Sequence, residues 1–117
     1  MVTEGFRVVS ENEAGAHWDR WLAAFEDRGI RQSHAWGRHK TGGWTPLRAA
    51  LFTDGAPSAM ALLLTRRAPL GAAALAWANA GPVFRRGRGG PASGRGERDL
   101  AALRAFLLGL TAHFRRV

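Results

Sequence analysis

The chain has 117 residues and 46% of them are apolar, which suffices for one hydrophobic core and excludes two independent domains. Cysteine is absent, which excludes disulfide scaffolds, thiolate nucleophiles and cysteine-ligated zinc. The formal net charge is +8, and Lys40 is the only lysine among the 17 basic residues. This charge indicates either a polyanionic partner, such as nucleic acid, a phosphorylated precursor or acidic lipid headgroups, or a solvated arginine surface without a specific partner.

Two segments bear on where the protein is expected. The N-terminal residues Met1 to Glu4 carry no basic residue and precede no apolar h-region, so they lack the features of a secretory signal peptide. The longest apolar region, 68–84, is interrupted by proline and glycine and is too short to cross a bilayer as a helix. The sequence therefore predicts a cytoplasmic protein without a transmembrane helix.

The N-terminal segment predicts a strand followed by a helix. Residues 6–9 are a short β-branched and aromatic run typical of a strand. Ser10 and Glu13 have the spacing of a capping box, and Gly29 can supply the turn that ends the helix they begin. Five apolar residues then share one helical stripe and predict its buried face: Ala14, Trp18, Trp21, Leu22 and Phe25.

A second, shorter helix is predicted over residues 34–41. Ser33 stands immediately before it and can cap its first turn, and the glycines at 42–43 end it. Trp36 and Lys40 are four residues apart and are therefore expected on the same face of this helix.

The middle of the chain predicts three antiparallel strands. From Pro46 the apolar residues alternate up to the dipeptide at 54–55, Asp-Gly, which is a common signal for a tight hairpin turn. The returning strand, 58–67, is apolar on both faces at its centre, as expected of a central strand covered by helices on both sides. A turn leads into a further apolar strand, 72–77, which completes an antiparallel meander.

The last part of the chain predicts a basic loop and a long helix. Residues 85–96 are rich in glycine, proline and arginine and are typical of a mobile loop. Residues 97–115 carry acidic residues in the first turn and basic residues in the last, as expected of a helix. The stripe expected to cover the sheet consists of Leu100, Leu103, Leu107, Leu110 and Phe114.

This order of elements resembles the N-acyltransferase core of the GNAT fold up to its third helix. The resemblance implies an α/β (α+β) fold with a mostly antiparallel sheet and helices on both faces. A fifth strand follows in that fold, so we expect residues 1–117 to form a single partial lobe, truncated before that strand. The edge of the strand at 72–77 would then expose unpaired amides and favour self-association.

Within GNAT-like proteins, four segments resemble the Fem family of peptidoglycan aminoacyltransferases, also called FemAB-like proteins. They are residues 32–40, 43–48, 62–71 and 75–84. The shared pattern comprises a Gln-Ser-x-x-Trp-Gly helix start at 32–37, Gly-Trp at 43–44, a strand that ends in Arg66 and Arg67, and Gly-Pro-Val at 81–83. Full-length members carry two GNAT-like lobes, and this chain corresponds to the first.

The resemblance implies a tRNA-dependent transfer, in which an amine on a peptidoglycan precursor attacks the ester of an aminoacyl-tRNA to form an interpeptide bridge. The precursor is a UDP-linked muramyl peptide or lipid II, which suggests a peripheral position at the inner membrane face, and the aminoacyl-tRNA is a co-substrate that binds through the second lobe. No metal or redox cofactor is implied, and no catalytic residue is assigned. In the family, residues at the positions of Lys40 and Trp44 hold the precursor near its phosphates.

The residue types allow both functional and structural readings. Arg66 and Arg67 end a strand and can anchor phosphate or simply be solvated. Lys40 can bind pyrophosphate or stabilise a helix C-terminus, and Trp44 can contact a sugar or belong to the core. The four histidines lack the spacing of a metal site, and no Gly-x-Ser-x-Gly elbow makes a serine a nucleophile.

Two alternative functions remain open. An acyl-coenzyme A-dependent enzyme acting on a polysaccharide or another amine would need a phosphate-binding loop at 86–91. Gly89 matches that loop, but Pro91 removes an amide donor and disfavours coenzyme A. A non-catalytic RNA-binding or interaction module would use the loop from Arg85 to Arg95 against phosphates, although no aromatic residues alternate with its arginines as single-strand binders require.

Overall fold

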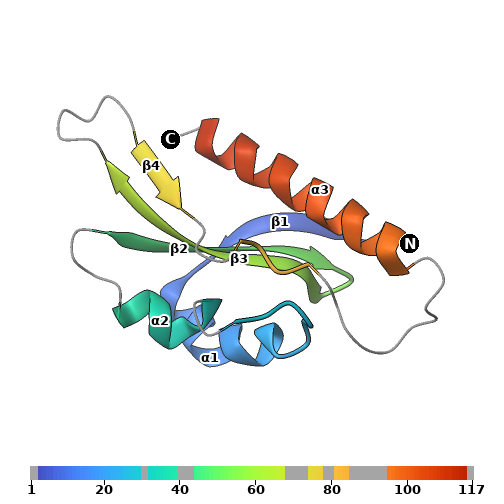
Figure 1. Cartoon of the computed structure of the whole chain (residues 1–117), viewed down its shortest axis with the longest axis horizontal. Coiled ribbons are helices and arrows are strands. Elements are labelled where there is room, and N and C mark those ends of the chain that lie inside the picture. The colour runs from blue at the N-terminus through green and yellow to red at the C-terminus, as the bar shows by residue number, and fades with distance from the viewer. Residues whose placement is uncertain are drawn as a thin grey trace.

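The computed structural model describes residues 3–29, 32–39, 44–67, 74–77, 81–84 and 95–115. In these residues a four-stranded sheet has the order β1-β2-β3-β4, and every neighbouring pair is antiparallel. The helices α1 and α2 lie on one side of the sheet and α3 lies on the other (Figure 1). The elements are β1 (Glu4–Val9), α1 (Glu11–Leu22), α2 (His34–His39), β2 (Thr45–Thr53), β3 (Ala56–Arg67), β4 (Ala74–Trp77) and α3 (Arg95–Arg115). The predicted α+β class and antiparallel meander are confirmed.

The central strand β3 separates two hydrophobic clusters. Met60 and Leu62 belong to the cluster that includes Trp18 and Phe25, beneath α1. Ala59, Ala61 and Leu63, the alternate residues of the same strand, belong to the cluster that includes Phe106 of α3. Because successive side chains of a strand point to opposite faces, a strand buried on both faces must be apolar throughout. The prediction of a central strand at this position is confirmed.

The hairpin between β2 and β3 forms at the predicted dipeptide. Asp54 has a φ of 51° and Gly55 a φ of 85°, which is the left-handed pair that a two-residue hairpin turn requires. The register pairs Arg48 with Leu62 and Thr45 with Thr65. The turn and a register shift between Leu51 and Phe52, typical of a β-bulge, together decide which residues of the two strands lie together at the opposite end of the sheet.

The helix α1 begins as predicted and ends earlier. The Ser10 hydroxyl accepts a hydrogen bond of 3.2 Å from the Glu13 amide, as the capping box requires. The helix ends at Leu22, so the prediction that Gly29 ends it was wrong. The amide of Phe25 donates to Leu22 at 3.1 Å, three residues back, and this tighter turn closes the helix. Phe25 is fully buried beyond the helix end.

The helix α3 covers the sheet with a stripe that includes Leu110 and Phe114, as predicted, but not Leu100 or Leu107. Leu100 and Leu107 are 62% and 45% exposed, whereas Phe106 is fully buried. A Cβ at Gly109 would lie 2.5 Å from Phe6 of β1, so only glycine lets the helix approach the sheet this closely here. The helix is rotated so that its smaller side chains face the strands. The residues packed with Phe106 are Ala102, Ala105, Leu110 and Phe114.

Several predictions lie partly or wholly outside the described residues. These are the C-terminal part of the helix at 34–41, the start of the strand at 72–77 and most of the basic loop at 85–96. The segment after β4 is described again from Gly81, where φ is 73°. Val83 then pairs with Met60 and continues along the edge of β3.

Candidate functional site

Two of the predicted binding residues meet at one end of the sheet. Trp44 immediately precedes β2, and Arg66 is the penultimate residue of β3. Because Thr45 pairs with Thr65, these flanking residues lie next to each other, and the Arg66 guanidinium carbon lies 4.9 Å from the centre of the Trp44 ring. Trp44 is half-buried and Arg66 is exposed. This geometry is a cation–π contact at the surface.

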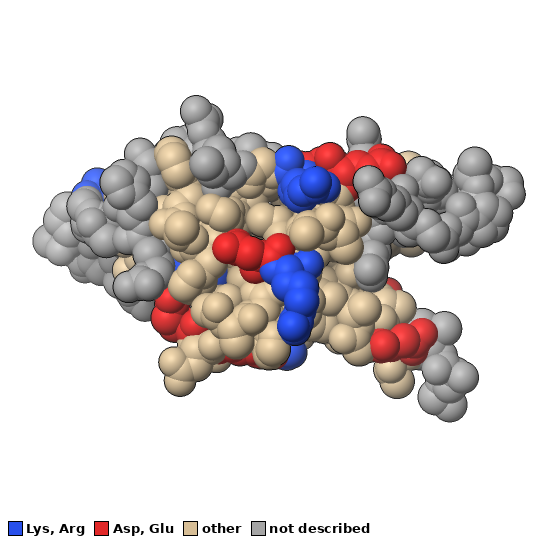
Figure 2. All heavy atoms as spheres, turned by 90° about the horizontal axis from the view of Figure 1, so that it is seen from below, with Lys and Arg blue, Asp and Glu red and all other residues tan. Residues whose placement is uncertain are grey.

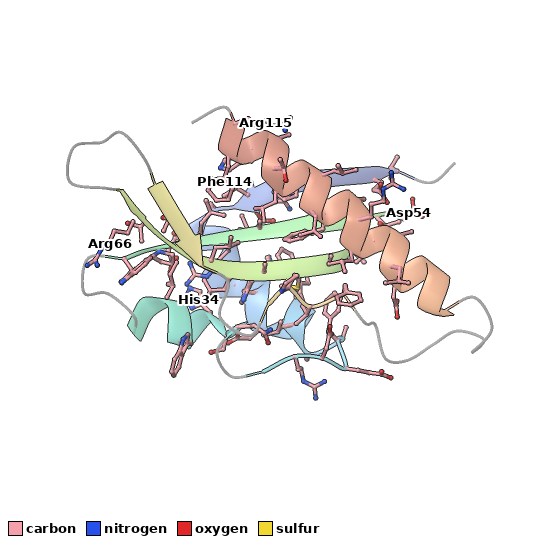
Figure 3. The ribbon with its side chains drawn as sticks, turned by 45° about the horizontal axis from the view of Figure 1, so that its top comes forward. His34, Asp54, Arg66, Phe114 and Arg115 are labelled. Carbon is pink, nitrogen blue, oxygen red and sulfur yellow. The ribbon has the colours of Figure 1, made fainter. Side chains whose placement is uncertain are left out.

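The pair lies far from the hairpin. Figure 3 shows Arg66 and Asp54 at opposite ends of the sheet, with α2 beneath the Arg66 end. Arg67 pairs with Ala74 through the backbone, and its side chain lies outside the described part. Lys40 lies outside the described residues, one position after the end of α2. The structure therefore brings Trp44 and Arg66 together and does not place the side chains of Lys40 and Arg67.

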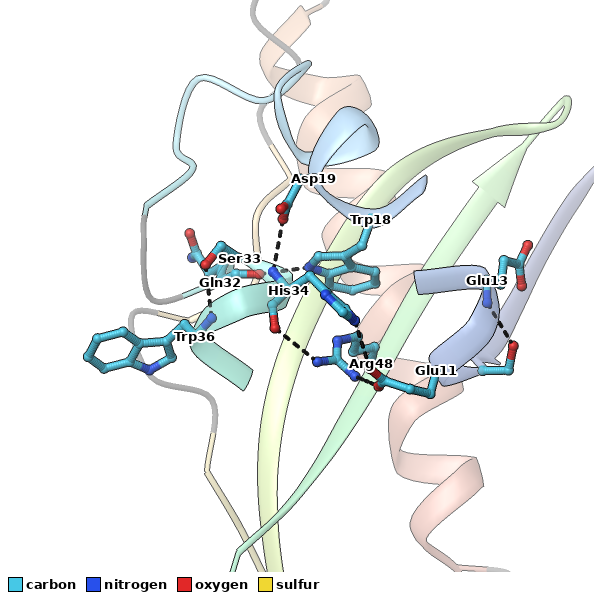
Figure 4. A network of polar contacts seen from close by, with 10 residues as sticks. Glu11, Glu13, Trp18, Asp19, Gln32, Ser33, His34, Trp36 and Arg48 are labelled. Carbon is cyan, nitrogen blue, oxygen red and sulfur yellow. Dashed lines mark hydrogen bonds and ion pairs between the residues drawn. The ribbon is translucent and has the colours of Figure 1, made fainter. Parts of the chain in front are cut away.

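A polar cluster anchors α2 to the sheet. It consists of Glu11 at the start of α1, His34 at the start of α2, and Arg48 on β2 (Figure 4). Glu11 Oε1 lies 2.7 Å from His34 Nε2, and its Oε2 accepts from Nη1 of Arg48 at 2.5 Å. Arg48 Nη2 also donates to the His34 carbonyl at 3.2 Å. One buried guanidinium thus joins the first helix, the second helix and the sheet.

The electrostatics of the cluster favour an ionised carboxylate. The side chain of Arg48 is only 3% exposed, and that of Glu11 is 57% exposed. Desolvation by partial burial raises the pKa of Glu11, but the hydrogen bond to His34 and the charge of Arg48 outweigh it and hold the pKa below its ordinary value. Because an ionised carboxylate only accepts hydrogen bonds, His34 Nε2 carries the proton in this contact.

Gln32 connects the start of α2 to the segment that follows β4. Its Nε2 donates to the Gly81 carbonyl at 3.0 Å, and its Oε1 accepts from the Gly29 amide. The Gln32 carbonyl accepts a hydrogen bond of 2.7 Å from the buried indole of Trp18. Gln32 itself is 2% exposed. A buried amide with these partners holds together segments that lie 49 residues apart in the sequence.

Two side chains cap α2. The Ser33 hydroxyl accepts from the Trp36 amide at 3.2 Å, which confirms its predicted capping role. A carboxylate oxygen of Asp19, on α1, accepts from the His34 amide at 2.8 Å. Both bonds satisfy amides of the first turn, which have no partner within the helix.

Sequence reasoning missed Glu11, Asp19 and Arg48 as organising residues. Arg48 had a usable signal, because it occupies an inward position of a strand whose neighbours on that face are apolar. Glu11 and Asp19 had none, since acidic residues on the first helix also fit a solvated surface. Their partners are 37 and 15 residues away.

A second surface feature lies beside α1. A hollow of about 390 Å³ is bordered by the stacked rings of His17 and Trp21 and by the Arg7 guanidinium, which lies 4.2 Å from the Phe52 ring centre. Arg7 is engaged by Glu13 in two hydrogen bonds, at 2.5 and 2.7 Å. Arg20, which also lines the hollow, lies 2.6 Å from Nδ1 of His17 through its Nη2. Both arginines are thus engaged by neighbouring side chains, and we assign no ligand to the hollow.

The molecule is an α+β domain with helices on both faces of an antiparallel sheet. Comparison with protein-family models, with curated proteins and with solved structures finds no match to the chain. In the described ranges, no three acidic or histidine side chains group as a metal site would need, and no helix has the length and apolar character to span a membrane.

Proposed function

We propose that the chain is the GNAT-like, precursor-binding lobe of a Fem-type, tRNA-dependent aminoacyltransferase. The lobe holds a phosphorylated peptidoglycan precursor, a UDP-linked muramyl peptide or lipid II, at the cytoplasmic face of the membrane. A second lobe supplies the aminoacyl-tRNA, whose ester is attacked by the precursor amine. In this proposal the chain positions the acceptor, and no catalytic residue is assigned to it.

The observation that carries the proposal is the physical connection between the motif segments. Gln32, at the start of the first motif segment, bonds to Gly81 of the last, and Arg48 of the second bonds to the carbonyl of His34 in the first. The resemblance to the Fem family depends on the order of these segments along the chain. Their mutual hydrogen bonds support it, because they hold α2 and the end of the sheet in one fixed arrangement.

The end of the sheet offers suitable chemistry for such a precursor. A guanidinium beside a tryptophan ring combines a positive charge with a planar fork of donors that matches the geometry of phosphate. The indole contributes a large flat surface for a sugar or peptide. Arg66 and Trp44 provide this combination. Lys40 then adds a compact ammonium charge for the pyrophosphate, as the family resemblance implies.

Titration calorimetry of the full chain with a UDP-linked muramyl pentapeptide tests the proposal. We expect saturable binding, weakened about tenfold or more in Lys40→Ala and in Arg66→Ala, because each removes a charge-assisted contact. Arg104→Ala is the matched control, since it removes an exposed cation from α3 on the other face of the sheet. Absence of binding, or equal weakening in the control, would refute the proposal.

Titrations of the same chain with coenzyme A and with RNA separate the alternatives. Binding of coenzyme A that is indifferent to Lys40→Ala would favour an acyl-coenzyme A-dependent enzyme. RNA binding with a steep salt dependence would favour a nucleic-acid module. Among the described residues of the face formed by α1 and α2, acidic and basic side chains are interspersed (Figure 2), and these residues do not form a continuous basic track for RNA.

A further inference from the structure

The helix α3 has a second apolar face, opposite the one that covers the sheet. Phe106 is fully buried against the strands, whereas Leu100 and Leu108 are each 62% exposed and Leu107 is 45% exposed. A helix that covers one sheet needs only one apolar stripe. The leucines on the outer side therefore require a separate explanation.

These outer residues form a continuous surface. They border a shallow hollow of about 290 Å³ with few polar atoms. Thr111 lies within this surface, but its hydroxyl donates to the Leu107 carbonyl of the same helix at 2.8 Å, so its donor is already satisfied. Among the described side chains, Arg104 is the charged residue that lines the hollow. We call the set the outer leucine face, and it comprises Leu100, Leu103, Arg104, Leu107, Leu108 and Thr111.

The charge of this part of the chain indicates what the face contacts. Residues 85–117 contain eight arginines and two acidic residues, so they hold six of the chain's eight net positive charges. Two copies of so basic a region repel each other, which disfavours self-association through this face. Exposed leucines give RNA bases no aromatic ring on which to stack. An anionic bilayer accounts for both the exposed leucines and the positive charge, because leucines enter the acyl boundary while arginines contact lipid phosphates.

We propose that the outer leucine face of α3 docks on an anionic bilayer surface, with α3 lying in the plane of the membrane. Arg104 has a long apolar stem, so it can lie among the leucines and place its guanidinium at the headgroups. The sheet-facing stripe is unaffected, because Phe106 and its neighbours remain against the strands. This inference is independent of the precursor site, since it concerns the opposite side of the sheet and needs no precursor.

Flotation of the full chain with lipid vesicles tests this docking. The vesicles contain phosphatidylcholine alone or phosphatidylcholine with phosphatidylglycerol, and no precursor. We expect binding to the anionic vesicles only. The double variant Leu100→Gln/Leu108→Gln should reduce the bound fraction at least about tenfold, because two largely exposed leucines no longer enter the bilayer. Val8→Gln, which alters a 39% exposed apolar residue on β1, is the matched control and should bind as the unaltered chain does.

Each other outcome would overturn the proposal. Absence of vesicle binding would do so, and so would binding that the leucine variant leaves unchanged. A concentration-dependent dimer that the leucine variant abolishes would assign the face to a second copy of the chain. Circular dichroism of the variants shows whether α3 remains folded. Leu108→Met keeps an apolar side chain that can enter the bilayer, and this variant should therefore retain vesicle binding.

Discussion

The buried Arg48 on β2 and the exposed Glu11 at the start of α1 form an ion pair of 2.5 Å between Nη1 and Oε2, although 37 residues separate them in sequence. The same guanidinium donates to the first carbonyl of α2. One buried cation therefore helps to hold α2 beside the sheet, together with the hydrogen bonds of Asp19 and Gln32.

Replacing Arg48 should destabilise the domain substantially. Arg48→Leu removes the donors for Glu11 and for the His34 carbonyl, and we expect a loss of about 2–4 kcal/mol in the free energy of unfolding. Arg7→Leu is the control, because it breaks the ion pair with Glu13 at the surface and should cost about 1 kcal/mol or less. Denaturant titration measures both, and equal losses would contradict the assigned role of Arg48.

Two glycine-to-alanine changes in helices should have opposite effects. Gly109→Ala places a methyl group within 2.5–2.8 Å of Phe6, so α3 must move from the sheet, at a cost of about 1–3 kcal/mol. Gly15→Ala in α1 meets only the His34 ring, at 3.8 Å, and should stabilise by about 0.5–1 kcal/mol through its higher helix propensity. Thermal melts of both variants measure this, and destabilisation by Gly15→Ala would show that α1 is packed differently.

Two residues of α3 that lie two positions apart, Phe106 and Leu108, should differ in their effect on stability. Phe106→Ala leaves a cavity between the helix and the sheet and should cost about 3–5 kcal/mol. Leu108→Ala removes a side chain that is 62% exposed and should cost about 0.5 kcal/mol or less. Chemical denaturation distinguishes them. A larger loss from Leu108→Ala would contradict the burial of Phe106 and the exposure of Leu108 in the structure.

Acid should weaken the domain through Glu11 and Glu13. The pKa values of both carboxyl groups in the folded protein lie below the ordinary 4.5. For Glu11, partial burial raises the pKa, but the hydrogen bond to His34 and the charge of Arg48 outweigh it. For Glu13, the hydrogen bond from Arg7 is the main cause of the lowering. A lowered folded pKa gives stability that is present above the unfolded pKa and is lost as the pH falls through the folded one. The variant Glu11→Gln/Glu13→Gln should therefore lose less stability between neutral pH and acid. An unchanged pH profile would contradict this.

The contact between Trp44 and Arg66 should be measurable as a coupling. A double-mutant cycle with Trp44→Ala and Arg66→Ala should give a coupling of about 0.5–1 kcal/mol in stability, as expected of an exposed cation–π pair. Arg66→Lys should retain part of it, since a cation remains over the ring. Additive effects of the two single variants would show that the residues do not interact in solution.

Local sequence signals predicted much of the fold. Ser10 with Glu13 and Ser33 mark helix starts, because a side-chain oxygen one turn from a free amide acts at short range. The Asp-Gly pair at 54–55 supplies the positive φ values of the hairpin, and the apolar run of β3 follows from burial on two faces. These features depend on neighbours within a few residues.

The tertiary structure alone decided how the elements fit together. In the sequence of α3, the leucines fit a helical stripe as well as the residues that are in fact buried do. The close approach of Gly109 to Phe6 decides which of the two faces lies against the sheet. Glu11 and Asp19 were indistinguishable in sequence from ordinary polar residues, and Gln32 was known only as part of a motif, because the contacts of all three are with distant partners. By itself, then, the sequence determined where most elements form, through local hydrogen bonding and periodicity. Which faces are buried, and which polar groups meet, was decided by packing between residues far apart in the chain.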